Sequence, residues 1–467
     1  VSGDGIDITA AADLGGATTF DLSGNGQNEL TLTSTATTAW TADTAVTFGA
    51  AEDSGGNDDK IVNSANVTLT VSGRDDDFDA ATTITGGTGT DTLKISATGD
   101  GTGANLAAVT NVEKVDVVDA VTAGTDIIIT PNLTTVKSTI IDGTELDGSV
   151  QNDETLKVLG DTAAGTLDLR GGGGQDSLYG GAKNDTIDGG LGVDSLDGNG
   201  GADHITGGAG NDKITMGSKA EFISAVGADT VDGGAGVDTV VWTGAMTMAS
   251  TQLGSISNTE IWSIAGGSDF TISDAVLANN PGIVFAYAGN GTLSGGEDTA
   301  GAALMSSAIT WSGSAAGNMK LVGSSADDSY TFNATATLTV DDTIDGNAGT
   351  DTLFLNNNTS PGGADGTGNA VTAAFDADVK GIEKIVVNDL AVDYGGNIAI
   401  TITNGYLDTS LTIDATSLDV DPTAEGTGET LTVSNNDTNV KLTVLGGAAR
   451  DTVTGNGGAD SIVGNGA

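Results

Sequence analysis

The stretch GGGGQDSLY-GGAKNDTID-GGLGVDSLD-GNGGADHIT-GGAGNDKIT, residues 171–215, consists of five consecutive nine-residue blocks. Each block has Asp at its sixth position and an aliphatic residue at its eighth. Glycine permits the positive-φ backbone of a tight turn, and an Asp carboxylate is a hard oxygen ligand. The aliphatic residue begins a short strand whose side chain faces inward. This fixed period predicts a calcium-binding parallel β-roll.

Two blocks make one coil of such a roll, so each block stacks on the block two further along the chain. The predicted carboxylate pairs are therefore Asp176 with Asp194, Asp185 with Asp203, and Asp194 with Asp212. Backbone carbonyls of the glycine-rich turns should complete each coordination sphere. We expect them at Gly172, Gly174, Gly190, Gly192, Gly208 and Gly210.

A run of ordinary hairpin turns is the alternative interpretation of these blocks. It does not explain why the period stays at nine over five blocks. Two blocks depart from the pattern, because Lys183 replaces the fourth-position glycine and Asn199 replaces the second. We expect Lys183 to weaken its nearest site.

Further blocks recur outside this stretch, at 86–94, 233–241, 346–354, 446–454 and 455–463. Weaker matches end in Asp7, Asn28, Asp229, Asp328 and Asp342. Isolated blocks lack a partner two blocks away. An alternative role for the Gly-Asp turn there is to connect strands of the coil without binding calcium. Among the residues outside 171–215 we expect metal ligands at Asp91, Asp229, Asp238, Asp351, Asp451 and Asp460.

The composition is strongly acidic, with 64 Asp and Glu against 15 Lys and Arg and a formal net charge of −49. Self-repulsion of this size disfavours a compact chain unless cations intervene. No basic patch exists to release the counterions of nucleic acid, so nucleic acid is excluded as a partner. Disorder is also disfavoured, since 37% of the residues are hydrophobic and lie in short β-prone runs.

The chain has no Cys and a single histidine, His204. Disulfides, thiolate metal sites and Cys nucleophiles are therefore absent, and one histidine cannot make a zinc protease site. The sequence contains no G-x-S-x-G, S-x-x-K or P-loop motif. It begins at Val1 without a signal peptide, and no apolar run reaches transmembrane length. We expect a targeting signal to lie outside this sequence.

A longer repeat encloses the blocks. Glu113 follows Asp91 by 22 residues, Glu260 follows Asp238 by the same interval, and Glu383 follows Asp351 after a longer insert. We expect these glutamates to share a structural role at a coil corner, with calcium ligation as the minority interpretation. The repeat predicts a tail of a preceding unit at 1–85, a unit at 86–232 that holds the main roll, and further units at 233–345 and 346–467.

Nearly all segments have the pattern of strands of four to seven residues, rich in Val, Ile and Thr and bounded by Gly, Asn, Asp and Ser. Short helices are possible at 218–226, 273–280 and 369–379. Trp242 and Trp262 are expected to cap the solenoid edge or fill a contact between units, with a sugar platform as the weaker alternative. The predicted fold is all-β: an elongated parallel β-solenoid of tandem units with calcium-binding turns.

The Gly-Asp-Thr-aliphatic blocks and the recurring aliphatic-x-x-aliphatic-Glu strand resemble those of bacterial surface-layer proteins of the RTX type. The resemblance covers essentially the whole chain, although only 171–215 is sharply diagnostic. It implies type I secretion to the bacterial cell surface and folding on contact with external Ca2+. It also implies lateral packing of copies into a sheet or sheath. The anchor would be lipopolysaccharide or an anchoring domain outside this chain.

Two other functions compete with this interpretation. The chain could be a repetitive spacer of a secreted RTX adhesin or extracellular filament. Unequal units of about 110 to 150 residues favour a lattice protein over the near-identical modules of a spacer. A secreted hydrolase is the second alternative, since paired carboxylates are plentiful. Basic and aromatic residues are too scarce for a polysaccharide cleft, and we expect no enzyme.

Overall fold

A computed structural model of the 467-residue chain describes the residues named here, and every structural statement below refers to them. They are 18–21, 29–32, 44–47, 60–63, 69–74, 78, 82–87, 90–96, 104–106, 108–118, 127–131, 139–146, 155–160, 163, 165–217, 222–224, 227–287, 291–295, 307–313, 319–332, 338, 342–357, 371–376, 378–389, 398–403, 409–418 and 430–464. Asp7, Asn28 and most of the predicted helix 218–226 lie outside these ranges.

The chain divides into two compact units. Unit 1 comprises residues 1–241 and 257–259, and unit 2 comprises residues 242–256 and 260–467. The predicted boundaries near 86, 233 and 346 stay predictions. Strands β23 (Thr239–Trp242) and β25 (Ile256–Ser257) contain the sequence junctions between the two units.

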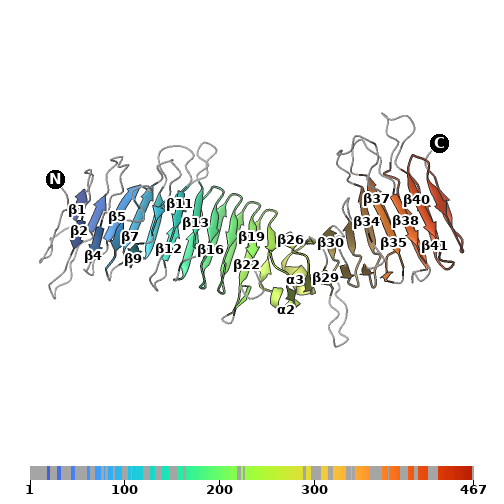
Figure 1. The fold of residues 1–467 in the computed structure, drawn as a ribbon, viewed down its shortest axis with the longest axis horizontal. Helices are drawn as coiled ribbons and strands as arrows, with labels where there is room; N and C mark the ends of the chain where they lie inside the picture. Colours follow the sequence, from blue (N-terminus) through green and yellow to red (C-terminus); the bar gives the residue numbers. More distant parts are fainter. Residues whose placement is uncertain are drawn as a thin grey trace. The chain divides into compact units, whose positions relative to one another are not determined.

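Unit 1 is a stack of short parallel strands, which Figure 1 draws from blue to green. One sheet contains, in order, β1 (Thr18–Asp21), β3 (Thr44–Thr47), β5 (Leu69–Arg74), β7 (Thr92–Ser96), β10 (Lys114–Val118), β12 (Thr139–Asp142), β14 (Leu167–Arg170), β16 (Thr186–Leu191), β18 (His204–Ala209) and β22 (Thr230–Ala235). A second contains β8 (Ala104–Asn105), β11 (Ile127–Thr130), β13 (Leu156–Leu159), β15 (Ser177–Tyr179), β17 (Ser195–Asp197) and β19 (Lys213–Met216). A third contains β2 (Glu29–Leu32), β4 (Lys60–Asn63), β6 (Thr83–Thr85) and β9 (Val109–Thr110), and β20 (Ile223–Ser224) pairs antiparallel with β21 (Gly227–Ala228).

The nine-residue blocks form coils of 18 residues, as predicted. Ser177 on β15 pairs in parallel with Ser195 on β17, and Thr186 on β16 pairs with His204 on β18. Side chains alternate between the two faces of a strand, so the eighth-position residues all point into the coil. Leu178, Ile187, Leu196, Ile205 and Ile214 each have 0% exposure and form the aliphatic core of the roll.

Unit 2 continues the same architecture with longer coils. One sheet contains β26 (Ile261–Ile264), β28 (Val284–Tyr287), β30 (Thr310–Gly313), β32 (Ser329–Phe332), β34 (Thr352–Asn357), β37 (Lys384–Asp389), β39 (Ser410–Asp414), β41 (Lys441–Leu445) and β43 (Ser461–Val463). A second contains β24 (Thr247–Met248), β27 (Ser268–Thr271), β29 (Gly291–Ser294), β31 (Met319–Val322), β33 (Thr343–Asp345) and β36 (Val379–Lys380). A third contains β35 (Val371–Phe375), β38 (Ile398–Ile402), β40 (Leu431–Asn435) and β42 (Thr452–Thr454).

Aromatic side chains fill the beginning of unit 2. Trp242 packs against Trp262 with ring centroids 5.7 Å apart, and Phe270 lies 5.2 Å from Trp242 in an edge arrangement. Both tryptophans are buried, at 1% and 0% exposure. They are core residues of unit 2. A sugar platform would need an exposed ring face, which neither offers.

Only two short helices occur in the described part of the chain, α2 (Ser250–Leu253) and α3 (Asp274–Asn279). The second confirms the predicted helix at 273–280. The predicted helix at 369–379 is wrong, because Val371–Phe375 forms strand β35, which pairs in register with Ile398–Ile402. Its apolar residues fit either period, and cross-strand pairing decides between them. No helix in the described ranges has the length and apolar character of a membrane span. The fold is the predicted all-β parallel solenoid.

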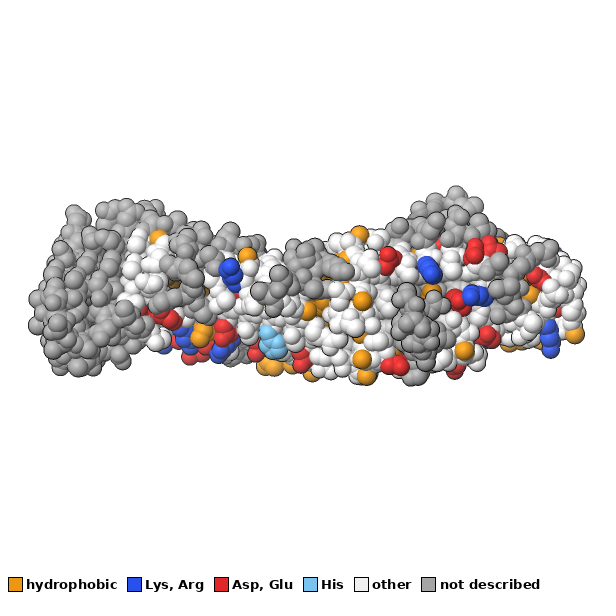
Figure 2. All heavy atoms as spheres, turned by 90° about the horizontal axis from the view of Figure 1, so that it is seen from below, with side chains coloured by type: hydrophobic (Ala, Val, Ile, Leu, Met, Phe, Trp, Pro, Cys, Tyr) orange, Lys and Arg blue, Asp and Glu red, His pale blue; other side chains and the backbone are white. Residues whose placement is uncertain are grey.

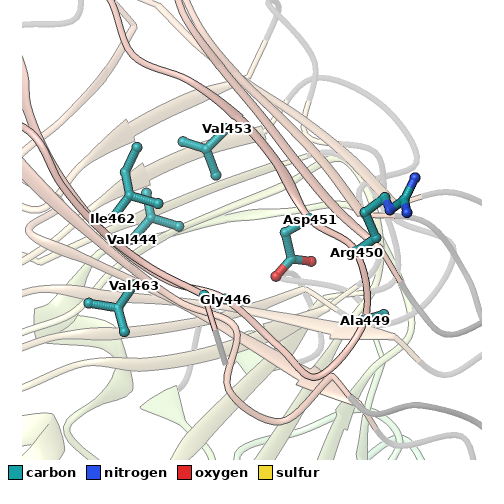
Figure 3. A pocket seen from close by; sticks show the side chains of 9 residues that line it. Val444, Gly446, Ala449, Arg450, Asp451, Val453, Ile462 and Val463 are labelled. Atoms are coloured by element: carbon teal, nitrogen blue, oxygen red, sulfur yellow. The ribbon is translucent and has the colours of Figure 1, made fainter. Parts of the chain in front are cut away.

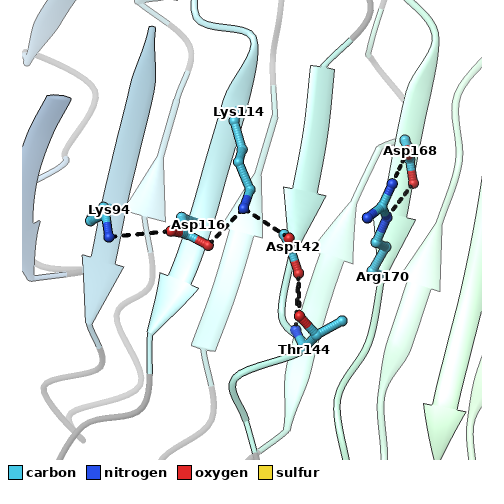
Figure 4. A network of polar contacts seen from close by, with 7 residues as sticks. All are labelled: Lys94, Lys114, Asp116, Asp142, Thr144, Asp168 and Arg170. Carbon is cyan, nitrogen blue, oxygen red and sulfur yellow. Dashed lines mark hydrogen bonds and ion pairs between the residues drawn. The ribbon is translucent and has the colours of Figure 1, made fainter. Parts of the chain in front are cut away.

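The few basic side chains of unit 1 neutralise outward-facing carboxylates. Lys114 Nζ lies 3.1 Å from Asp116 Oδ1 and 2.9 Å from Asp142 Oδ2, as Figure 4 shows. The hydrogen bond to Asp142 raises the pKa of Lys114. Arg170 forms a two-point pair with Asp168 in the same sheet. On the face drawn in Figure 2, blue lysine and arginine side chains likewise lie among red acidic ones. Exposed pairs of this kind contribute about 0–1 kcal/mol each. Because the chain has 64 acidic and only 15 basic residues, most of its negative charge stays unbalanced.

Candidate calcium-binding sites

The sixth-position aspartates form two ladders that run along unit 1. In the first ladder, the backbone N–H of Asp176 donates to Oδ1 of Asp194 at 2.8 Å, and the N–H of Asp194 donates to Oδ1 of Asp212 at 2.8 Å. The N–H of Asp212 then donates to Oδ1 of Asp238 at 2.8 Å. The interval is 18 residues inside the roll and 26 at its last step. The predicted stacking of each Asp on the Asp two blocks on is therefore present.

The second ladder alternates with the first. The N–H of Asp185 donates to Oδ1 of Asp203 at 2.7 Å, and the N–H of Asp203 donates to Oδ1 of Asp229 at 2.8 Å. Asp229 belongs to a weak sequence match, yet it occupies the same position as a full block. All the ladder aspartates are buried, so the carboxylates lie inside the turns and away from solvent.

The second carboxylate oxygen, Oδ2, separates eight of the buried aspartates into two groups. In the closed group, Oδ2 accepts a hydrogen bond at 2.6–2.8 Å from the backbone N–H four residues earlier. In the open group, Oδ2 is buried and accepts no hydrogen bond from the described residues. The closed carboxylates are Asp91, Asp176, Asp185 and Asp328, and the open carboxylates are Asp194, Asp203, Asp212 and Asp351.

The backbone of the turn explains this division. In each open group member, the residue four positions before the Asp has a left-handed φ: 102° at Gly190, 59° at Asn199, 111° at Gly208 and 67° at Asn347. The corresponding residues of the closed group, Gly87, Gly172, Gly181 and Ser324, are not among the described left-handed residues. Since φ sets the direction of the N–H, a left-handed residue turns its donor away from the carboxylate. The open carboxylate then lacks a donor.

The open turns fit a hard cation. A buried carboxylate oxygen without a hydrogen bond is costly unless a cation or a proton compensates it. The first glycine of each block borders a small cradle: a Cβ added to Gly189 would lie 2.4 Å from both Asp194 Oδ2 and the Gly207 carbonyl oxygen. Gly207 repeats this arrangement, at 2.6 Å from Asp212 Oδ2 and 2.3 Å from the Gly233 carbonyl. Carboxylate and carbonyl oxygens are the ligands that Ca2+ prefers.

The six glycines predicted as carbonyl ligands form columns along the turns. The carbonyl oxygen of each faces the equivalent glycine one coil further on, where an added Cβ would meet it at 1.4–2.4 Å. The tightest approach is between the Gly192 carbonyl and Gly210, at 1.4 Å. These carbonyls are Gly172, Gly174, Gly190, Gly192, Gly208 and Gly210. A side chain at Gly192, Gly210 or Gly236, the fourth positions of three blocks, would therefore collide with the oxygen column.

Burial dominates the electrostatics of the ladders. Burial, together with the neighbouring carboxylates, raises the pKa of Asp194, of Asp203 and of Asp351 to about 7. The pKa of Asp185 rises to about 6, and burial also raises those of Asp176, Asp212 and Asp328. The carboxyl groups of Asp194, Asp203 and Asp351 therefore hold protons near neutral pH. A divalent cation that binds there would displace the proton.

Two of the three recurring glutamates, Glu113 and Glu383, satisfy a backbone N–H with their side chains, as the predicted structural role requires. Oε2 of Glu113 accepts the N–H of Asp91 at 2.9 Å, and Oε2 of Glu383 accepts the N–H of Asp351 at 2.8 Å, so each takes the place of the next aspartate in a ladder. The backbone carbonyls of Glu113, Glu260 and Glu383 each accept an N–H of the following coil. Two residues before each glutamate lies a left-handed residue: Asn111, Asn258 or Gly381.

The remaining predicted ligands lie at ladder positions of less complete turns. Oδ1 of Asp451 accepts the N–H of Leu431 at 3.0 Å, and Oδ1 of Asp460 accepts that of Leu442 at 3.0 Å. Within the described ranges, no three acidic or histidine side chains converge on one point. Any calcium site here is therefore built from one or two carboxylates and main-chain carbonyls. The assignment of individual ligands stays a prediction.

A hollow of about 330 Å³ lies beside the last described strands of unit 2. Figure 3 shows Val444, Val453, Ile462 and Val463 around it, with Asp451 at its edge and the Arg450 guanidinium directed away. Ile462 is 51% exposed, whereas equivalent side chains of inner coils are buried. The hollow is thus the apolar interior of a coil that no described strand covers.

A family model for the RTX calcium-binding nonapeptide repeat (4 copies) matches residues 170–205, 188–218, 225–241, 341–358 and 443–467. These segments contain the ladder turns described above and cover less than half of the chain. The chain therefore carries RTX repeats, and Ca2+ is the ion that such repeats bind. No curated protein matches the chain significantly. No solved structure matches it either.

The sequence did not reveal which turns leave a carboxylate open. The repeat pattern predicts the same ligand role for Asp176 and Asp194, although only Asp194 has a buried Oδ2 without a hydrogen-bond donor. The available signal was the pair of left-handed positions, the second and fourth of a block. Every open turn has Gly or Asn at the second position and Gly at the fourth. The turn 171–175 (GGGGQ) also has these residues, yet its Gly172 is not left-handed, so the residue types alone do not predict an open turn.

Proposed function

We propose that the chain is a calcium-dependent extracellular structural protein, secreted by the type I route, which assembles laterally into a surface layer or sheath on a bacterial cell. The observation that carries the calcium part is the set of open carboxylates. Without an ion they place buried, closely stacked acidic groups inside the turns. With an ion they are bridged to main-chain carbonyls, so binding and folding become one equilibrium.

This coupling suits a secreted protein. Extracellular calcium modules bind at about 10⁻⁴–10⁻³ M, which leaves the chain unfolded inside a cell and folded outside. A chain with a net charge of −49 and no cysteine lacks disulfides as an alternative source of stability.

The lateral contact has a candidate surface, the turn strip, defined as residues 189–193, 207–211 and 233–237. The strip contains no charged residue. Leu191, Val193 and Val237 are exposed on it at 60%, 51% and 48%, and Leu191 is in register with Ala209 and Ala235. Copies of a strongly acidic chain repel each other, so an uncharged apolar strip is the surface on which they approach at least cost. The opposite turn, at 180–184, carries Lys183 and Asn184 instead.

Electron microscopy of the purified chain in millimolar calcium tests the assembly. We expect ordered two-dimensional arrays that dissolve in chelator. A triple variant Leu191→Ser, Val193→Ser and Val237→Ser should stay monomeric while keeping its β-structure. The control variant Ala182→Ser and Ala202→Ser, on the opposite turn, should assemble normally. Dispersed single fibres from wild-type chain would instead favour the adhesin-spacer function.

An enzymatic function is the less favoured candidate, since the hollow beside β43 has Asp451 as its one carboxylate. Incubation with acidic and neutral polysaccharides tests this directly. Release of shorter products by the purified chain would establish a hydrolase and overturn the structural proposal.

A further inference from the structure

We propose that Asp351 and Glu383 form a calcium site in unit 2 that is independent of the main roll at 171–215. The site is built by one isolated block, 346–354, and the coil corner Gly381–Glu383, which is not a nine-residue block. It thus needs no second RTX block above it. The inference rests on the calcium-binding part of the proposed function and on no part of the assembly.

The Asp351 carboxylate is held by its neighbours on one side only. Its Oδ1 accepts the N–H of Asp328 at 2.7 Å, and its own N–H donates to Oε2 of Glu383 at 2.8 Å. Its Oδ2 is buried and has no hydrogen-bond donor among the described residues, in a side chain with 0% exposure. One carboxylate oxygen is therefore committed to the scaffold, and the other is available to an ion.

The turn around this oxygen has the open geometry of the main roll. Asn347 and Gly349 have φ of 67° and 139°, as the second and fourth residues of the open RTX turns do. A Cβ added to Gly346 would lie 2.4 Å from Asp351 Oδ2 and 1.9 Å from the Gly381 carbonyl oxygen. The left-handed Gly381 thus supplies the carbonyl that the first glycine of a second block supplies in the roll.

The local charge favours a cation. The negative charges of Asp328, Glu383 and Asp327 raise the pKa of Asp351, which shows that its carboxylate lies among other acidic groups. The basic side chain on the neighbouring strand, Lys380, is paired with Asp345, at 2.5 Å. The atoms that could coordinate a metal here are carboxylate and carbonyl oxygens, without nitrogen or sulfur. Such a ligand set selects a hard ion such as Ca2+.

Unit 1 contains a closely matched turn that lacks the open oxygen. Asp91 donates its N–H to Glu113 Oε2, as Asp351 does to Glu383, and the N–H groups of Glu113 and Lys114 return to the Asp91 carbonyl. In this turn, however, Gly87 donates its N–H to Asp91 Oδ2 at 2.7 Å. The same sequence motif therefore gives one open and one closed carboxylate. We infer that the Asp91 turn binds no ion.

Equilibrium dialysis of the full chain against calcium tests the assignment. Asp351→Asn should bind about one calcium ion fewer than wild type, because the amide keeps the Oδ1 acceptor but removes the charge. Asp91→Asn should bind the same number as wild type. Circular dichroism establishes that each variant is folded in calcium. If Asp351→Asn does not fold, Glu383→Gln decides, and it should weaken the same ion at least tenfold.

The outcomes separate this inference from the proposed function. A wild-type chain that binds no calcium sinks the proposed function itself. A wild-type chain that binds calcium, with unchanged stoichiometry and affinity in Asp351→Asn or in Glu383→Gln, overturns only the site in unit 2. Equal losses in Asp351→Asn and Asp91→Asn would also contradict it, because the closed turn should contribute nothing.

Discussion

The backbone N–H of Asp194 donates a 2.8 Å hydrogen bond to Oδ1 of Asp212, one coil further along the roll. This bond joins two coils and fixes the carboxylate in the turn. Oδ2 of Asp212 remains buried without a donor. The protein scaffold thus positions an acidic oxygen at every open turn and leaves its compensation to the solvent ions.

Replacing Asp194 by Asn should lower the stability of the folded chain in calcium but should not lower it in chelator. In saturating calcium the variant loses a charged ligand, and we expect a loss of about 1–3 kcal/mol in the free energy of unfolding. In chelator at pH 8 the same change removes a buried uncompensated charge, so the variant should be at least as stable as wild type. Thermal melts measure the change in calcium, and the residual β-structure seen by circular dichroism measures it in chelator. Destabilisation of equal size in the two conditions would contradict a ligand role.

Replacing Gly210 by Ala should disrupt the roll. The added Cβ would lie 1.4 Å from the Gly192 carbonyl, at a φ of 146° that an L-residue rarely adopts. We expect a loss of more than about 2 kcal/mol. Gly200 is the matched control, because its nearest contact to an added Cβ is 3.8 Å and its φ is not left-handed. Chemical denaturation in calcium compares them, and similar stabilities would refute the packed turn column.

Without calcium, stability should rise as the pH falls. The pKa of Asp194 and of Asp203 is raised from 3.8 to about 7 in the folded chain. Between these values the folded state holds protons that the unfolded state has released, so the free energy of unfolding decreases as the pH rises through this window. The fraction of folded chain in chelator, measured by circular dichroism at pH 5 and pH 8, tests this, and we expect it to be larger at pH 5. Greater stability at pH 8 would show that these groups are not buried in the folded state.

Replacing Lys183 by Gly should allow the closed turn 180–184, in which Gly181 donates its N–H to Asp185 Oδ2, to adopt the open backbone and bind calcium. Fourth-position glycines of the open turns have φ of 122° to 153°, a range that Lys cannot adopt without strain. The Lys183→Ala variant is the control, since it removes the charge without permitting that backbone. We expect tighter binding in calorimetric titration for the glycine variant alone. Equal gains in both variants would assign the effect to charge.

The period of nine predicted most of the fold, because each block contributes one turn and one inward aliphatic residue. Ile205 and Leu196 are buried where the eighth position required it. The 369–379 segment was misassigned, since its apolar residues suit a helix as well as strand β35, and only pairing with β38 decides. The sequence predicts that Trp242 and Trp262 cap the solenoid edge or fill a contact between units, whereas the structure places both in the core of unit 2.

The candidate sites were less predictable than the fold. The ladder partners followed from the period, but the open and closed carboxylates depend on the φ of a residue four positions earlier. Gly172 and Gly190 have the same identity and the same block position, yet only Gly190 is left-handed. The coil that precedes Gly172 in the stack is not made of nine-residue blocks. Gly173 donates its N–H to the carbonyl of Leu146 in that coil. The neighbouring coil, not the local sequence, decides the backbone of that turn.

The most direct test of calcium-coupled folding is circular dichroism of the full chain during calcium titration from a chelated state. We predict a mostly unstructured chain in chelator and a cooperative gain of β-structure, with a midpoint on the order of 10⁻⁴–10⁻³ M calcium. A spectrum rich in β-structure that persists unchanged after complete removal of calcium would contradict the account.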